Sequence, residues 1–275
     1  LKMKKSLITL GVLALFVLMA YGQEKKFALY SVAFYNMENL FDTIHDEGKN
    51  DYEYLPNGTN QWNTMKYKAK LKNMSEILSM LSTDKLPMGP AIIGVSEIEN
   101  YRVLEDILKQ PALADRGYQY VHYEGADQRG VDCAFFYNPK LFELTNSKLV
   151  PYVYINDTVH KTRGFLIASG NIAGEKMHFI VNHWPSRAAA SPVRERAGEQ
   201  VRAIKDSLLR EDSAAKIVIM GDMNDDPMDK SMAVALGAKR KPVDAGPTDL
   251  YNPWWDTLKK GYGTLMYKGK WNLFD

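Results

Sequence analysis

The sequence near position 220 changes abruptly from an apolar strand to a cluster of polar residues. Residues 216–220 form the short apolar run of a buried strand, and Gly221 follows, where the backbone can bend sharply or approach a ligand closely. Asp222 and Asn224 are two residues apart, so in an extended chain their side chains point the same way, at the edge of the sheet. A carboxylate and an amide placed there can share one substrate, although the same residues, ending in Pro227, also make a common turn.

Three other expected strands, over residues 27–36, 91–95 and 176–182, also lead into polar residues. Each polar residue alone has an ordinary structural explanation: a loop cap, a solvated strand end or a buried histidine. Their recurrence at four strand ends predicts that these ends converge on one rim and form a site. The residues concerned are Asn36, Glu38, Glu97, Asn182 and His183.

This set of side chains suits a hard divalent cation. Carboxylates and an amide, without a thiolate, favour Mg²⁺ (or Mn²⁺), held by one or two acids, water and substrate oxygens. Imidazole and a carboxylate can orient water and stabilise charge on phosphorus, and arginines can hold a phosphate with paired hydrogen bonds. The sequence therefore predicts metal-assisted attack of water on a phosphate ester.

Each predicted site residue has an expected role. Glu97 is expected to be the main metal ligand, with Glu38 and Asn36 assisting. Asp222 is expected to orient water or a catalytic group, with Asn224 on a phosphate oxygen and His183 as the catalytic imidazole. The expected phosphate-binding residues are Asn182, Arg129, Arg163 and Arg187.

The rest of the sequence predicts many strands and few long helices. Apolar residues at helical spacing from Tyr67 to Leu81 predict an amphipathic helix, and Ser191 is expected to cap a long second helix with Pro192 at its first position. This pattern favours an α/β (α+β) protein with two sheets that carry helices on their outer faces. Further elements are expected as short helices near residues 103–109 and 231–236, strands at 132–138 and 165–169, and a surface loop over 42–60.

Residues 1–22 have the pattern of a signal peptide. Lysines precede an uncharged, mostly apolar stretch over residues 7–20, which is too short and wrongly flanked for a membrane span. Cleavage near Gly22 leaves a secreted or periplasmic domain of residues 23–275 and changes the net charge from +2 to −1. Any contact with nucleic acid must therefore come from a local patch.

Two other features bear on structure and partners. Cys133 is the only cysteine, so no intramolecular disulfide is possible, and its strand-like surroundings predict an inert buried residue. Residues 251–255 (Tyr-Asn-Pro-Trp-Trp) could stack nucleic-acid bases or touch lipid, although aromatic residues of this kind more often pack within the protein.

These motifs together resemble the endonuclease/exonuclease/phosphatase superfamily, which includes pancreatic-type deoxyribonucleases, abasic-site endonucleases, inositol-polyphosphate phosphatases and sphingomyelinases. The resemblance runs from about Phe27 to the last residue, and it implies a four-layer α-β-β-α sandwich of the deoxyribonuclease-I type. It rests on Asn36-Met37-Glu38, Glu97, Arg129-Gly130-Val131-Asp132, His183 and the Asp222/Asn224 pair. The phrases most similar to secreted bacterial nucleases are Asn39-Leu40-Phe41-Asp42-Thr43, residues 182–187 and residues 222–227.

One feature of the family is missing from the sequence. The family ends with a strand that opens on an aspartate and then a strand entered by Ser-Asp-His, whose histidine is catalytic. Residues 271–275 resemble the start of the first of these strands, so Asp275 resembles the aspartate that orients that histidine. We therefore expect a C-terminally truncated member of the family, and we expect a protein ending at Asp275 to be poorly soluble or partly folded, and inactive.

The sequence leaves three functions open. The first is a secreted, divalent-metal-dependent phosphodiesterase, most simply a monomeric endonuclease acting on nucleic acid. The second is a phosphatase or sphingomyelinase acting on a lipid headgroup or small phosphoester, which the near-neutral charge keeps open. The third belongs to another class: a module that binds metal and phosphate without catalysis.

Overall fold

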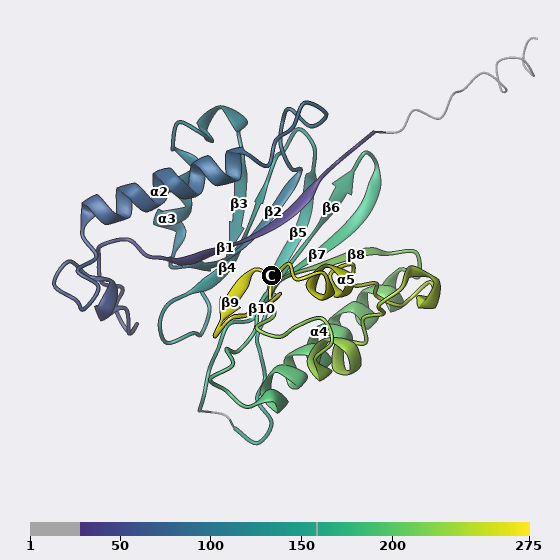
Figure 1. Ribbon diagram of the computed structural model, residues 1–275. Helices are drawn as coiled ribbons and strands as arrows, with labels where there is room; N and C mark the ends of the chain where they lie inside the picture. Colours follow the sequence, from purple (N-terminus) through teal and green to yellow (C-terminus); the bar gives the residue numbers. More distant parts are fainter. Residues whose placement is uncertain (1–27, 158) are drawn as a thin grey trace, which may run out of the picture.

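Two four-stranded β-sheets form the centre of the molecule (Figure 1). The computed structural model describes residues 28–157 and 159–275, so the expected signal peptide lies outside the described residues. The first sheet has the order β1-β2-β4-β3, with β1 (Val32–Leu40), β2 (Ile92–Ile98), β3 (Gln119–His122) and β4 (Asp132–Tyr137). The second has the order β5-β6-β7-β8, with β5 (Glu143–Val150), β6 (Phe165–Ile172), β7 (Glu175–His183) and β8 (Lys216–Asp222).

Helices cover the outer face of each sheet, so the fold is the expected four-layer α-β-β-α sandwich. Helices α2 (Thr64–Ser79) and α3 (Tyr101–Leu108) pack against the first sheet, and α4 (Ser191–Glu211) with the short helix η3 (Ser231–Leu236) packs against the second. The inner faces of the two sheets meet in an apolar layer that includes Phe135, Leu166 and Phe179. Burial of such side chains is the main force that holds the sheets together.

Each sheet contains one pair of parallel strands joined through an outer helix. The chain runs from β1 through α2 to β2, and from β7 through α4 to β8. In these pairs Asn36 lies beside Ser96 and His183 lies beside Asp222. Because parallel strands end on the same edge of a sheet, both pairs deliver their last residues to one edge.

Several element boundaries differ from the sequence prediction. Strand β1 begins at Val32, continues through a register shift after Asn36 and ends at Leu40, so it lies later in the sequence than the expected strand over residues 27–36. Helix α4 begins at Ser191 with Ala190 in the capping position, so the prediction of Ser191 as the cap is wrong. The Ser191 hydroxyl donates instead to the Glu195 carboxylate at 3.2 Å. The predicted loop over residues 42–60 includes a single helical turn, η1 (Tyr52–Tyr54).

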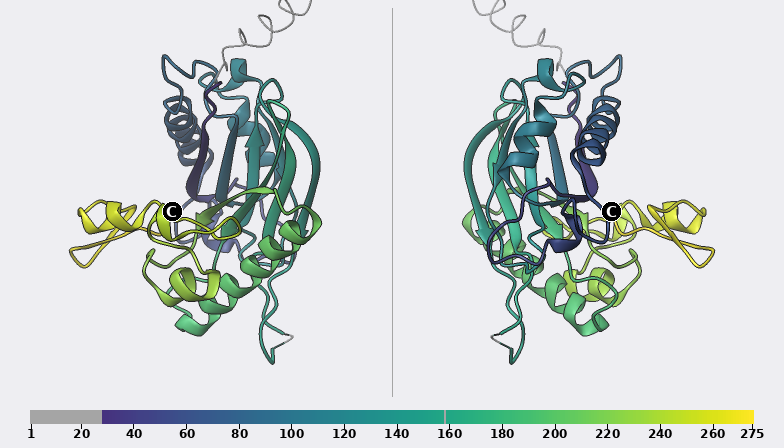
Figure 2. Two further views of the ribbon diagram at one scale, coloured as in Figure 1. Left: turned by 90° about the vertical axis from the view of Figure 1, so that its right-hand side faces the viewer. Right: turned by 90° about the vertical axis from the view of Figure 1, so that its left-hand side faces the viewer.

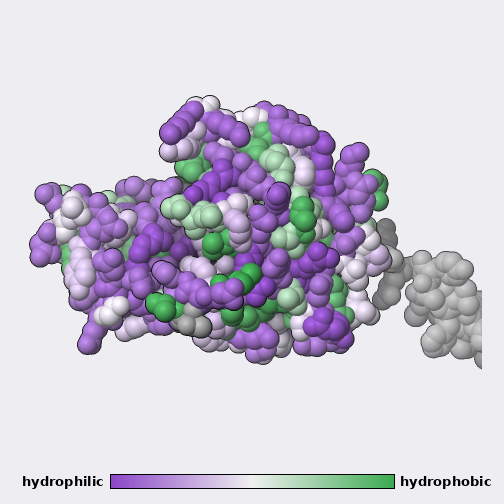
Figure 3. Space-filling view, turned by 90° about the horizontal axis from the view of Figure 1, so that it is seen from below, coloured by the Kyte–Doolittle hydropathy of each residue, from purple (hydrophilic) through white to green (hydrophobic). Residues whose placement is uncertain are grey.

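The C-terminal segment leaves the sandwich and projects from its side, as the yellow part of Figure 2 shows. It carries α5 (Trp255–Lys259), β9 (Leu265–Tyr267) and β10 (Lys270–Asn272). The molecule seen from below is mostly hydrophilic, with hydrophobic residues in scattered groups (Figure 3). No helix within residues 28–157 and 159–275 is long and apolar enough to cross a membrane.

Cys133 lies on β4 and is buried between the sheets. Burial raises the pKa of its thiol, so the thiolate that reacts with oxidants or metals is disfavoured. This agrees with the expectation of an inert residue.

Candidate active site

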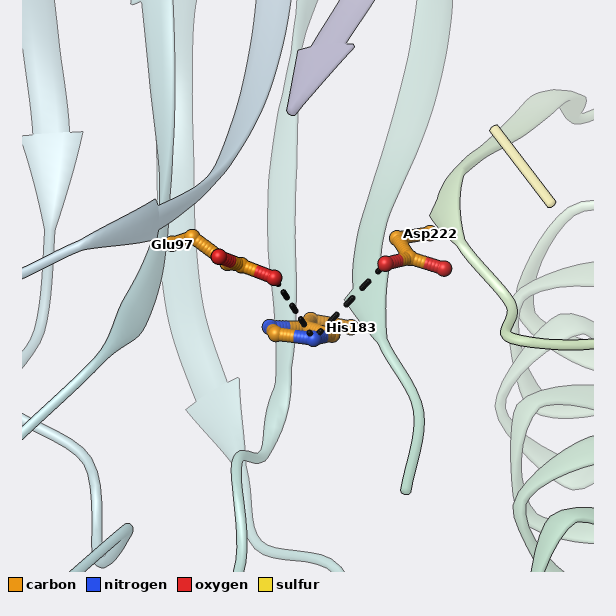
Figure 4. Close-up of side chains that lie close together, drawn as sticks. All are labelled: Glu97, His183 and Asp222. Carbon is orange, nitrogen blue, oxygen red and sulfur yellow. Dashed lines mark ion pairs between the residues drawn. The ribbon is translucent and has the colours of Figure 1, made fainter. Parts of the chain in front are cut away.

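Three ionisable side chains from three strands meet where the parallel pairs end (Figure 4). The Nε2 atom of His183 lies 3.6 Å from Glu97 Oε1 and 3.8 Å from Asp222 Oδ2. These atoms all lie within 4.8 Å of one another, close enough to surround one cation. Glu97 comes from the first sheet and the other two come from the second, so the group spans the edge between the sheets.

Asn36 from β1 completes the connection between the two acids. Its side-chain nitrogen donates to Asp222 Oδ2 at 3.1 Å and lies 3.4 Å from Glu97 Oε1. Its oxygen accepts the backbone N–H of Glu38 at 2.8 Å. The ends of all four parallel strands, β1, β2, β7 and β8, therefore contribute to one site, as the sequence predicts.

Irregular backbone turns several of these side chains toward the site. Glu97 occupies a β-bulge, because the pairing of β2 with both neighbours shifts register between Ser96 and Ile98. Its φ is +58°, and Asn224 after β8 has φ +53°. Glu38 at the end of β1 has φ +50°. Residues other than glycine rarely adopt this left-handed region, and such strain is typical of functional sites.

Asp222 is buried, and its environment favours the protonated acid. Burial, followed by the negative charge of Asp275, raises the pKa of Asp222 to about 7. The backbone N–H of Asn224 donates to Asp222 Oδ1 at 2.9 Å and opposes part of this effect. A carboxyl group with a pKa near neutrality is well suited to exchange a proton during catalysis.

His183 is buried and therefore neutral. Burial lowers its pKa well below the usual value, and the positive charges of Arg163 and Arg129 add to this effect. Among the described residues its Nδ1 atom has no hydrogen-bond partner. A neutral imidazole can bind a cation or donate one hydrogen bond to a phosphate oxygen, whereas a charged one would be repelled by a cation.

The donors present fit a divalent cation. Two carboxylates and a neutral imidazole offer oxygen and nitrogen atoms without a thiolate, a set that suits Mg²⁺ or Mn²⁺ better than soft metals. Glu97 lies within this group, whereas Glu38 does not. The exposed Glu38 side chain stands beside the site, where its charge acts on Lys70 and Asp275. In the observed orientation Asn36 directs N–H groups toward the acids, so it positions them rather than binding the cation.

Two predicted phosphate-binding residues are used elsewhere in the structure. The Asn182 amide is fully buried and donates to the carbonyl groups of Ile180 and Met220. Because successive residues of a strand face opposite sides, Asn182 points away from the face occupied by His183. Its expected contact with phosphate is not available in this arrangement.

Arg187 belongs to an ion-pair network at the base of the C-terminal segment. Its Nη2 atom lies 2.9 Å from Asp229 and 3.3 Å from Asp226, and its Nη1 donates to Asn272 at 3.1 Å. The guanidinium also lies over the Phe274 ring, 4.3 Å from its centroid. These contacts indicate that Arg187 holds the C-terminal segment in place and does not bind a phosphate.

The other two predicted arginines are near enough for their positive charges to lower the pKa of His183. Arg163 is buried and donates to Asp127 at 3.0 Å and to the carbonyl of Trp184 at 2.8 Å. The side chain of Arg129 is 44% exposed, with its Nε 3.7 Å from Asp127. Of these two arginines, Arg129 therefore has the side chain that is exposed to a ligand, with Asp127 beside it. The side-chain amide of Asn224 donates to the Trp184 carbonyl at 3.0 Å. This carbonyl also accepts from Arg163, so the Asn224 side chain is held next to that arginine.

The sequence prediction missed several residues near the site. Asp127 holds both arginines, and Lys70 donates to the backbone carbonyl of Glu38 at 2.5 Å. A cavity of about 600 Å³ lies next to Arg129, and no periodic pattern marks it in advance. The residues lining it are Asn50, Tyr52, Glu53, Leu55, Asn57, Gly58, Thr59 and Arg129.

A second group, His122, Glu124 and Asp132, also places three possible ligand atoms together. His122 Nε2 lies 3.2 Å from Asp132, and Asp132 also accepts the backbone N–H of Gly125 at 3.1 Å. The ammonium group of Lys49 lies 3.9 Å from Glu124, so a protein cation already stands beside this group. We assign it to structure.

Three solved structures illustrate the likeness to known proteins. The catalytic domain of human nocturnin, with bound sulfate, is 18% identical, with 60% of this chain and 64% of that chain covered and a TM-score of 0.45. TDP2 from Caenorhabditis elegans is 17% identical, with 59% and 44% covered and a TM-score of 0.46. ANGEL2, described as a 2′,3′-cyclic phosphatase, is 13% identical, with 64% and 48% covered and a TM-score of 0.49. The chain spans less than two thirds of the length of each of these proteins.

Comparison with whole families gives the assignment. No protein of curated function matches the sequence. The sequence model of the endonuclease/exonuclease/phosphatase family matches residues 31–275, which include all the strand ends that form the site. The chain belongs to the endonuclease/exonuclease/phosphatase family.

Proposed function

We propose that this protein is a divalent-metal-dependent phosphodiesterase that cleaves nucleic acid. The observation that carries the proposal is the meeting of Glu97, His183 and Asp222 at the edge between the two sheets. Two acids and a neutral imidazole in one group, of which His183 and Asp222 are buried, with an arginine nearby, are the donors that hydrolysis of an anionic ester requires. Membership of the family supports the same reaction class.

We propose a role for each side chain of this group. Glu97 and His183 would hold the cation, which when bound supplies positive charge against the phosphate oxygens. Asp222, fixed by Asn36 on one oxygen and by Asn224 on the other, accepts a proton from the attacking water. Arg129 reaches the negatively charged substrate, while Arg163 adds positive potential from its buried position.

Asp275 lies close enough for its charge to raise the pKa of Asp222. Burial, together with the charges of Glu97 and Glu38, raises the pKa of Asp275 itself. Its Oδ1 atom has no hydrogen-bond partner within the described part of the chain. We propose that this carboxyl group orients a catalytic imidazole, the role that the family resemblance implies.

The test compares substrates under controlled metal. Assays use the full-length encoded protein. Bis(p-nitrophenyl) phosphate, p-nitrophenyl phosphate, plasmid DNA, RNA, sphingomyelin and a phosphoinositide are compared with Mg²⁺, with Mn²⁺ and with EDTA. We expect metal-dependent cleavage of the diester and of nucleic acid above the monoester.

Each other outcome rejects a part of this proposal. Preference for sphingomyelin or the phosphoinositide would replace the nuclease with a lipid phosphoesterase. Binding of metal and phosphate without turnover of any substrate would make the protein a binding module. Equal rates of hydrolysis with EDTA and with metal would show that the reaction does not depend on a metal ion.

We further propose that the protein is exported and acts as a monomer. The apolar stretch behind the N-terminal lysines supports export. Cell fractionation with N-terminal sequencing of the product tests it, with a new N-terminus near residue 23 as the expected result. Light scattering of the purified protein tests the oligomeric state.

A further inference from the structure

The C-terminal arm, residues 254–272, is a projection with a well-formed tip. Strands β9 and β10 pair antiparallel, with Tyr267 beside Lys270, so Lys268 and Gly269 make a two-residue turn. Both turn residues have positive φ, +49° and +76°, the conformation of a tight hairpin turn. Figure 2 shows this hairpin extending away from the two sheets of the sandwich.

Exposed aromatic side chains lie along the arm. Tyr262 is 67% exposed, Tyr267 is 61% exposed and Trp254 is 50% exposed. Large aromatic side chains that remain in solvent contribute little to the core, and their flat faces are available to a partner. Lys268 lies over the Tyr267 ring, with its Nζ 5.2 Å from the ring centroid, so positive charge and aromatic surface alternate at the tip.

The arm also concentrates positive charge. It contains the exposed lysines Lys259, Lys260, Lys268 and Lys270. Its single acid, Asp256, is already paired with Arg240 at 2.6 Å. The whole sequence has a net charge of only +2, so this arm is a local basic patch on a nearly neutral protein. Such a patch attracts an anionic polymer.

The base of the arm is fixed to the candidate active site. Leu273 donates its backbone N–H to Asp226 at 2.8 Å, and Met223 donates its own to the Phe274 carbonyl at 2.8 Å. Met223 lies between Asp222 and Asn224, and the chain continues directly to Asp275. A ligand that lies along the arm is therefore guided to the residues that perform the chemistry.

We propose that the C-terminal arm binds the single-stranded part of a nucleic-acid substrate next to the phosphate that is cleaved. This inference rests on the proposed function. Exposed tyrosine and tryptophan faces stack on unpaired bases of any sequence, while lysines contact the flanking phosphates. A duplex hides its base faces and would use only the lysines.

The composition of the tip favours nucleic acid over a membrane. The outermost residues of the hairpin are Lys268 and Gly269, so insertion into lipid would bury an ammonium group at the leading point. Burial of an unpaired charge is strongly unfavourable. Against a polynucleotide the same lysine remains in water and meets a phosphate.

The test measures binding of a fluorescent oligo(dT) by anisotropy, with EDTA present to prevent cleavage. One variant combines Tyr262→Ala and Tyr267→Ala, and a second replaces the four arm lysines by glutamine. The matched control combines Tyr101→Ala, Lys68→Gln and Lys85→Gln, which are exposed residues of the first sheet's helical side. Thermal melting confirms that each variant folds.

The two arm variants should differ in their signatures. Loss of the tyrosines should weaken binding about tenfold for each ring, with little change in salt dependence. Loss of the lysines should reduce the slope of log affinity against log salt by about 0.7 for each phosphate that is no longer neutralised. The control should bind like the unchanged protein.

Three results would overturn the inference: no binding of oligo(dT) by the unchanged protein, equal binding by the arm variants, or binding to phosphatidylglycerol vesicles that depends on the arm while oligo(dT) binding does not. Hydrolysis of bis(p-nitrophenyl) phosphate by the unchanged protein is measured in parallel. If that hydrolysis is absent while oligo(dT) binding through the arm is present, the proposed chemistry fails and the binding surface stands.

Discussion

The side chain of Asn36 donates a hydrogen bond of 3.1 Å to Asp222, although the two residues are 186 positions apart in the sequence. Asn36 lies just before the register shift of β1 in the first sheet, and Asp222 is the last residue of β8 in the second. The bond therefore joins the sheets at the edge where Glu97 and His183 also meet. A site built in this way forms only when both sheets have folded and packed together.

Replacement of Glu97 by glutamine should abolish metal-dependent hydrolysis, because the amide keeps the shape and loses the charge that binds a cation. Glu38→Gln is the matched comparison, since Glu38 lies near the end of the neighbouring strand β1 and outside the three-residue group. Added Mn²⁺ should raise the melting temperature of the unchanged protein and of Glu38→Gln, but not of Glu97→Gln. Full activity of Glu97→Gln would show that the metal assignment is wrong.

Asp222→Asn should lower turnover by about 10²–10⁴-fold, the usual effect of losing a general base. The melting temperature should stay the same or rise slightly, because burial disfavours the charged form of this residue. Steady-state kinetics and calorimetry on the same samples measure the turnover and the melting temperature. A large fall in melting temperature would assign Asp222 to the structure of its turn.

Arg187→Ala should destabilise the protein rather than impair phosphate binding. The substitution leaves Asp225 and Asp226, which are buried, without one of their partners. Hydrogen bonds to charged groups contribute roughly 1.5–3 kcal/mol each when buried, and the half-exposed arginine should give the lower part of that range. Urea unfolding measures the loss. An unchanged unfolding curve with a raised KM would restore Arg187 to the substrate.

Stability should fall in acid partly because of His178, far from the site. Burial, followed by the charge of Lys176, lowers the pKa of His178 below 6.5, and its Nδ1 lies 2.7 Å from the Ser169 hydroxyl. Below pH 6.5 the unfolded chain binds a proton here more readily than the folded chain, so the free energy of unfolding decreases as pH falls. The free energy of unfolding is regained as pH rises to 6.5.

Chemical unfolding from pH 7 to 5 measures this effect. His178→Asn should make the free energy of unfolding less dependent on pH over that window. An identical pH dependence for His178→Asn and the unchanged protein would exclude this histidine as a cause.

Elements with a continuous apolar run or a regular helical pattern could be predicted from the sequence. Strands β2, β4 and β8 are short apolar segments followed by polar residues, and α2 repeats its buried positions at helical spacing. The site residues could be predicted because polar side chains recur where four of the expected strands end, which is unusual unless those ends converge on one site. The meeting of Glu97, His183 and Asp222 follows from that pattern.

The missed elements lack such a pattern. Strand β3 has only four residues, and β5 lies at a sheet edge with mixed polar and apolar residues. Edge strands need only one apolar side and are tolerant of polar residues, so their sequences resemble loops. Their positions are fixed by pairing with β4 and β6, which are distant contacts that a local pattern does not contain.

The direction in which individual side chains point also could not be predicted from the sequence. Asn182 and His183 are neighbours on one strand and must face opposite sides, but the pattern does not say which faces the site. Arg187 resembles a phosphate ligand until the structure shows that acidic residues after β8 surround it. In both cases, contacts with residues far away in the sequence fix the direction of the side chain.

The left-handed backbone of Glu97 implies that this position is a compromise between the stability of the fold and the proposed catalytic activity. Glycine adopts a φ of +58° freely, whereas a residue with a side chain does so at an energetic disadvantage of about 1–2 kcal/mol. Glu97 also places a negative charge beside Asp222 and Asp275, which raises the pKa of both. Glu97→Gly should therefore melt at the same temperature or higher while losing all turnover, and selection for thermal resistance alone would remove the residue that we propose as the metal ligand.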